Sequence, residues 1–73
     1  MENVRRCIVD KVIEYFSGGK VNCSDEVLQI MAIYNKDWDN CDADYDTSEG
    51  AEILNKIIES CVDEIMEHEG LAS

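Results

Sequence analysis

The residues whose type and spacing point most directly to chemistry are three alternating carboxylates, Asp42, Asp44 and Asp46. This alternation is how a calcium-binding loop of the EF-hand type begins, because the ion is surrounded by oxygen ligands. The sixth position of such a loop should be Gly and is Thr47, and the twelfth should be Glu and is Ile53. Both determinants are missing, so we expect neither a dedicated calcium site nor any other metal or cofactor.

Other residue types that carry out catalysis are present without the partners they need. His68 stands between two glutamates near the end of a predicted helix, where an imidazolium would compensate the helix dipole. No serine has a His at helical spacing that would activate it. The segment Gly18-Gly19-Lys20 lacks the remaining residues of a phosphate-binding loop and is typical of a turn. We therefore expect a protein that is not an enzyme.

The four cysteines stand at positions 7, 23, 41 and 61, without a CxxC spacing or a paired Cys/His signature. The start of the sequence lacks the uninterrupted apolar region of a secretory signal, which favours reduced thiols. Cys7 and Cys61 fall on apolar helix faces and are expected to pack as small apolar side chains. Cys41 lies among carboxylates and is expected to be exposed.

Charge is the most unusual property of this sequence. The 73 residues include 17 Asp and Glu against 6 Lys and Arg, which gives a net charge of −11, whereas solubility alone suggests a magnitude of about 2–8 for a small domain. Residues 1–36 carry five groups of each sign, so residues 37–73 hold the entire excess. This balance excludes a protein that binds nucleic acid directly through a basic face.

The acidic residues of the second half form two clusters. The first is residues 37–46, here called the acidic segment, which also contains two aromatic side chains. The second is one face of the last predicted helix, here called the acidic ridge, made of Glu52, Lys56, Glu59, Asp63 and Glu67. Carboxylates on one continuous surface favour a basic protein partner, and aromatic residues amid charge are typical interface anchors. The predicted partner-binding residues are Asp37, Trp38, Asp39, Asp42, Asp44, Tyr45, Asp46, Glu52, Glu59, Asp63 and Glu67.

Three segments show the periodicity of amphipathic helices, and none is typical of a strand. We expect helices at about 3–17, 25–37 and 47–69, because apolar residues recur in each at intervals of three and four. Ser24 is a good N-cap for the second helix and Gly70 ends the third. A chain of this length forms one domain. The predicted fold is a single all-α domain, residues 1–73, a small three-helix bundle with an acidic connection between its second and third helices.

The first predicted helix is more apolar than one face of a small bundle requires. Apolar residues recur every four positions from Val4 to Phe16, and further ones widen this stripe beyond half of the helix circumference. One interpretation is a symmetric dimer with Val9 or Ile13 at its seam. The other is that the additional apolar side chains belong inside the core of a single chain.

Size, charge and predicted compactness make the sequence similar to small acidic inhibitors, such as colicin immunity proteins and phage anti-restriction and anti-CRISPR proteins. The likeness is one of composition and not of motif, so no residue role is transferred. It favours a cytoplasmic inhibitor, encoded by a phage or mobile element, that mimics nucleic acid and occludes a basic surface of a nucleic-acid-handling host complex. No apolar run approaches the ~20 residues that cross a bilayer, so no membrane contact is expected. The alternative is a homo-oligomeric structural or regulatory module whose acidity serves only solubility.

Overall fold

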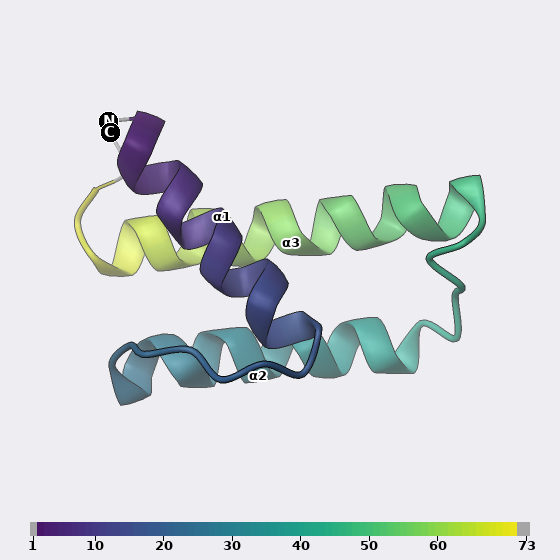
Figure 1. Cartoon of the computed structure of the whole chain (residues 1–73), viewed down its shortest axis with the longest axis horizontal. Coiled ribbons are helices and arrows are strands. Elements are labelled where there is room, and N and C mark those ends of the chain that lie inside the picture. The colour runs from purple at the N-terminus through teal and green to yellow at the C-terminus, as the bar shows by residue number, and fades with distance from the viewer. Residues whose placement is uncertain (1, 72–73) are drawn as a thin grey trace.

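Three helices account for most of the chain (Figure 1). The structure is a computed structural model, and it describes residues 2–71, with side chains from residue 4 onward. Helix α1 spans Glu2–Phe16, α2 spans Asp25–Asn40 and α3 spans Ser48–His68. The part of the chain that is described contains no strand. The predicted all-α three-helix fold is therefore confirmed.

The helices form two layers. Helices α2 and α3 lie side by side and antiparallel, and α1 crosses them diagonally, packing mainly against α3 (Figure 1). Because α1 crosses at an angle and is shorter than α3, it covers only part of the α2/α3 layer. The connection between α2 and α3 lies at one end of the longest axis, away from the start of α2 (Figure 1).

Local signals in the sequence explain where the helices begin and end. The Ser24 hydroxyl accepts a hydrogen bond from the Val27 N–H at 3.3 Å, which caps α2. Gly18 has a φ of +90° and Gly70 a φ of +73°, the left-handed conformation in which glycine ends a helix at little steric cost. Beyond Gly70, the Leu71 N–H donates to the Met66 carbonyl at 2.8 Å and closes the end of α3.

All three helices contribute to a small core. Each of the three helices contributes at least one buried side chain to it, and half-buried apolar side chains such as Ile8 and Tyr34 surround these. No buried side-chain oxygen or nitrogen atom within the described range lacks a hydrogen-bond partner. The core residues are Val12 of α1, Val27 and Met31 of α2, and Cys61, Val62 and Ile65 of α3.

The end of α2 differs from the prediction. The predicted helix ended at about residue 37, but α2 continues to Asn40 and includes Trp38 in its last turn. Aspartates at a helix C-terminus oppose the helix dipole. The half-buried Trp38 lies in a hollow beside α1 and α3, and this packing outweighs the weak local preference. Predicted bounds for the first and third helices, 3–17 and 47–69, differ from those observed by one residue at each end.

The start of α3 depends on a close backbone approach. The N-cap is Thr47, whose hydroxyl oxygen accepts from the Gly50 N–H at 2.9 Å, although Asp46 and Ser48 also have capping side chains. A Cβ at position 50 would clash with the carbonyl oxygen of Asp44. Gly50 therefore allows the acidic segment to fold directly against the first turn of α3.

Candidate binding surface

The acidic segment forms two parts of the structure. Asp37, Trp38 and Asp39 belong to the last turn of α2, and the remainder is the connection to α3. Both aspartates of that turn are exposed, whereas Trp38 between them is half-buried. The helix thus directs the indole inward and leaves the neighbouring carboxylates in solvent.

Hydrogen bonds between side chains and the backbone hold the connection in a defined turn. Asp42 has a φ of +55°, the left-handed conformation that ends α2. The Asp44 side chain accepts a hydrogen bond from the Asp46 N–H at 2.9 Å, and the Asp44 carbonyl accepts from the Thr47 hydroxyl at 2.8 Å. Asp42, Asp44 and Asp46 are all exposed. The turn therefore presents three carboxylates at one end of the molecule.

The acidic ridge runs along the exposed side of α3. Glu52, Glu59, Asp63 and Glu67 are all exposed, and Arg5 Nη1 of α1 donates to Asp63 Oδ1 at 2.8 Å. Glu52 lies near the connection, whereas Glu67 lies about 22 Å further along the helix at 1.5 Å per residue. The acidic segment therefore lies close to the start of the acidic ridge at Glu52. The end of the ridge at Glu67 lies far from the acidic segment, and the Arg5–Asp63 ion pair lies between them.

Both aromatic residues of the acidic segment line one hollow of about 450 Å³, here called the aromatic hollow. Trp38 belongs to α2 and Tyr45 to the connection, and Tyr45 is 66% exposed. An adjoining hollow of about 440 Å³ shares Ile13 and Ile58 with it and extends along α3 to Glu59. The aromatic hollow is lined by Ile13, Phe16, Ser17, Trp38, Tyr45, Leu54 and Ile58.

The two residues predicted at a dimer seam, Val9 and Ile13, both line the adjoining hollow but differ in burial. Val9 is half-buried and packs against the core. Ile13 is 45% exposed and lines the aromatic hollow. A dimer seam at Val9 or Ile13 therefore stays a prediction.

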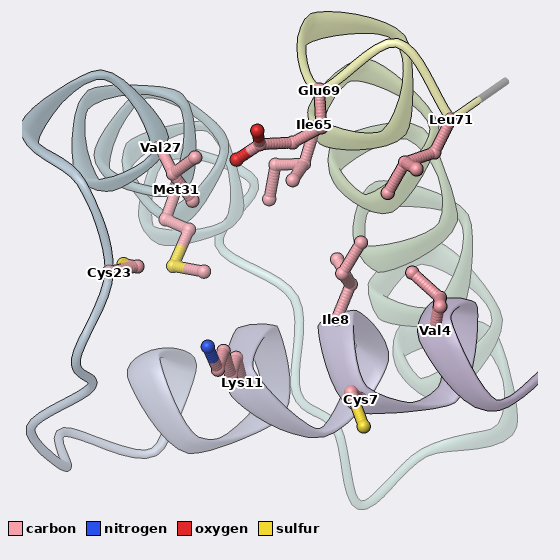
Figure 2. A pocket seen from close by; sticks show the side chains of 10 residues that line it. All are labelled: Val4, Cys7, Ile8, Lys11, Cys23, Val27, Met31, Ile65, Glu69 and Leu71. Atoms are coloured by element: carbon pink, nitrogen blue, oxygen red, sulfur yellow. The ribbon is translucent and has the colours of Figure 1, made fainter.

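A second hollow, here called the aliphatic groove, lies where the first half of α1 faces α2 and the end of α3 (Figure 2). It measures about 390 Å³ and is mostly apolar. Its two charged residues are Lys11, which donates to the Asn22 carbonyl at 3.3 Å, and Glu69 on the opposite side. Sequence reasoning missed it because its walls combine three helices. The lining residues are Val4, Cys7, Ile8, Lys11, Cys23, Val27, Met31, Ile65, Glu69 and Leu71.

The cysteines occupy contrasting environments. Cys61 is fully buried and Cys41 is exposed, as predicted. The prediction for Cys7 is wrong: its side chain is exposed, and its sulfur points away from the aliphatic groove (Figure 2). The apolar stripe of α1 is wider than the face that α3 and α2 cover, so its margin remains in solvent. Burial raises the pKa of the Cys61 thiol to about 12.

A tyrosine also fixes the register of α2 against α3. The Tyr34 hydroxyl donates to Glu64 Oε1 at 3.1 Å. Burial raises the pKa of the Tyr34 hydroxyl from its ordinary value, and the hydrogen bond to the Glu64 carboxylate adds to the effect. Both groups therefore have a structural role that links the two antiparallel helices.

No cluster of three or more His, Cys, Asp or Glu side chains within the described range is arranged to hold a metal ion. The three helices, as far as they are described, are too short or too polar to span a membrane. No family model matches the chain, and neither the curated proteins nor the solved structures contain a significant match to it. Function must therefore be inferred from the charge and geometry of this surface.

Proposed function

We propose that this chain is a non-enzymatic binding protein that covers a basic surface of a protein partner with carboxylates of the acidic segment and of α3. The observation that carries this proposal is that the carboxylates of the acidic half are exposed and that almost none of them is paired with a cation of the same chain. Among residues 4–71, Asp63 is the one acidic residue in a salt bridge, and the other predicted partner-binding carboxylates are solvent-exposed. Complementary charge of this kind accelerates association and excludes wrong partners.

The stability of the fold does not explain these charges. Glu59 and Asp63, and likewise Asp63 and Glu67, are like-charged pairs four residues apart on α3, and each such pair destabilises a helix by about 0.2–0.5 kcal/mol. Glu69 caps the end of α3, where the dipole prefers cations. Charges that cost folding stability are better explained by an interaction.

The partner class that fits is a nucleic-acid-binding protein, because such proteins present rows of Lys and Arg that neutralise phosphates. Covering those side chains would compete directly with nucleic acid, and the chain would act as an inhibitor in the cytoplasm. The alternative, that acidity serves only solubility, predicts no preference for basic proteins.

The test replaces Asp42, Asp44 and Asp46 together by Asn. Asn tolerates the left-handed conformation of residue 42, and its carbonyl can accept the hydrogen bond that Asp44 accepts now. The matched control removes the same charge from exposed positions of the first half, by Glu14→Gln, Asp25→Asn and Glu26→Gln. Immobilised wild type should retain nucleic-acid-binding proteins from a lysate at low salt and release them at high salt.

The Asn triple variant should retain much less than the control variant, while both keep native helicity by circular dichroism. A retained protein should lose its nucleic acid when free chain is added. Equal retention by the two triple variants would support the solubility interpretation and contradict the proposal.

A further inference from the structure

The aromatic hollow marks a part of the α2/α3 layer that α1 leaves uncovered. Helix α1 crosses the layer diagonally and ends at Phe16, so no helix lies over the end of the layer that is nearest the connection (Figure 1). The hollow at this place is lined by the apolar residues Leu54 and Ile58 and by the aromatic residues Trp38 and Tyr45, among others. We propose that it is the docking site of a basic amphipathic helix belonging to the partner, an inference that rests on the proposed function.

Charge around the hollow identifies its occupant. No charged residue lines the aromatic hollow itself, and the adjoining hollow is lined by Arg5 as well as Glu59. Asp37 and Asp39 flank Trp38 in the chain, and Asp44 and Asp46 flank Tyr45, and all four are exposed. Apolar side chains that enter the hollow are therefore best accompanied by cations that meet these neighbouring aspartates, which is the pattern of a helix with an apolar face bordered by Lys or Arg.

The geometry favours a helix over an extended segment. The described residues contain no strand and hence no sheet edge to which a peptide could add. An amphipathic helix in a groove instead uses anchors at positions i, i+3, i+4 and i+7, and needs only apolar surface from the receptor. The adjoining hollow that shares Ile13 and Ile58 prolongs this surface along α3 as far as Glu59, which gives room for successive anchors. Arg5 also lines it, and its guanidinium is paired with Asp63.

Trp38 is the single tryptophan of the chain and lines the hollow, so its fluorescence reports on docking directly. The probe is a synthetic helix of about 18 residues, long enough to be helical, made only of Leu and Lys with Leu at i, i+3, i+4 and i+7. Titration should shift the Trp38 emission to shorter wavelength as water leaves the indole. A scrambled peptide of the same composition should bind at least about tenfold more weakly, because aligned anchors supply most of the affinity.

Matched variants locate the site. Ile13→Ser and Tyr45→Ser each remove an exposed side chain of the hollow, whereas Ile33→Ser removes one that is 59% exposed and lies outside it. By calorimetry, the first two should raise the Kd for the aligned peptide about fivefold to tenfold, the size of a moderate hot spot. Ile33→Ser should leave the Kd within a factor of about two. Equal effects of all three variants, or equal binding of the two peptides, would overturn the docking site.

The same experiment separates this inference from the function on which it rests. If the Asn triple variant at positions 42, 44 and 46 weakens peptide binding but Ile13→Ser and Tyr45→Ser do not, the anionic surface stands and the hollow is rejected. If the hollow variants weaken binding but the Asn triple variant does not, the requirement for a basic helix is rejected together with the proposed function. If wild type sediments as a dimer at 100 μM and Ile13→Ser makes it monomeric, the hollow takes a second copy of this chain and the proposal fails.

Discussion

Cys61 lies at the centre of the core, fully buried against residues of all three helices. A thiol in this position acts as a small apolar side chain, because ionisation would place an unsolvated charge in the interior. This cost of ionisation raises the pKa of the Cys61 thiol to about 12. The sulfur is therefore protected from reaction while the fold is intact, whereas the exposed thiols of Cys7 and Cys41 remain accessible.

This environment predicts a loss of stability at alkaline pH. Below pH 9 the Cys61 thiol is protonated in both the folded and the unfolded chain; between pH 9 and pH 12 it ionises only in the unfolded chain. The unfolded state then binds fewer protons, so stability falls as pH rises, by at most about 1.4 kcal/mol per pH unit for one group. Thermal unfolding between pH 8 and pH 11 should show a smaller decline for Cys61→Ala than for wild type.

Cys41→Ala is the control for that comparison, because it removes a thiol that is exposed in the folded chain. Its decline should follow that of wild type. Tyr34, whose pKa is also raised, is present in all three proteins, and because the Cys61 charge is only a lesser cause of that shift, most of the Tyr34 contribution cancels from the differences. A constant gap between wild type and Cys61→Ala across this range would mean that the folded chain accommodates the thiolate.

At the scale of the helices, α3 contains charges that its own position disfavours. Glu67→Lys replaces a like-charged i,i+4 partner of Asp63 with a favourable one and puts a cation in the last turn of α3. Glu52→Lys makes the same change of charge but replaces a favourable Glu52–Lys56 pair by a repulsive one. We expect Glu67→Lys to be more stable than Glu52→Lys by about 1 kcal/mol, the sum of pair and dipole effects.

Chemical denaturation of the two lysine variants measures this difference directly. Both variants make the net charge less negative by the same amount. A gain in the free energy of unfolding that both share therefore measures the relief of overall repulsion, and the difference between them measures the effect of the position on α3. Equal stability would show that local pairs on this helix are fully screened.

Sequence patterns predicted the helices well where local and tertiary preferences agree. Ser24 and Gly70 mark helix ends by their own chemistry, and the structure places ends beside both. The end of α2 was not predictable from its carboxylates, because the burial of Trp38 against other helices decides it. The exposure of the acidic residues was predictable from composition, because charged side chains remain in solvent. The aromatic hollow and the aliphatic groove were not predictable from composition. Both hollows depend on the angle at which α1 crosses the layer, and no local pattern encodes that angle.

For the molecule as a whole, a net charge of −11 is distributed over a body with principal extents of 33 × 22 × 16 Å. Among the side chains from residue 4 to residue 71, the Arg5–Asp63 pair is the single salt bridge, and it is exposed. Exposed pairs contribute about 0–1 kcal/mol. The small core must therefore hold together a surface that repels itself, and the repulsion is concentrated at the acidic segment and along α3.

Salt should therefore stabilise the isolated protein. The Debye length falls from roughly 20 Å at 20 mM to about 6 Å at 300 mM sodium chloride, which is shorter than most spacings along α3. If screening recovers about 1 kcal/mol, the Tm should rise by about 4–8 °C for a chain of this size. The Asn triple variant at positions 42, 44 and 46 carries three fewer charges, so its Tm should start higher and rise less. A Tm that is flat or falls with salt would show that the carboxylates are already compensated within the fold, and a surface so compensated would have little electrostatic attraction left for a basic partner.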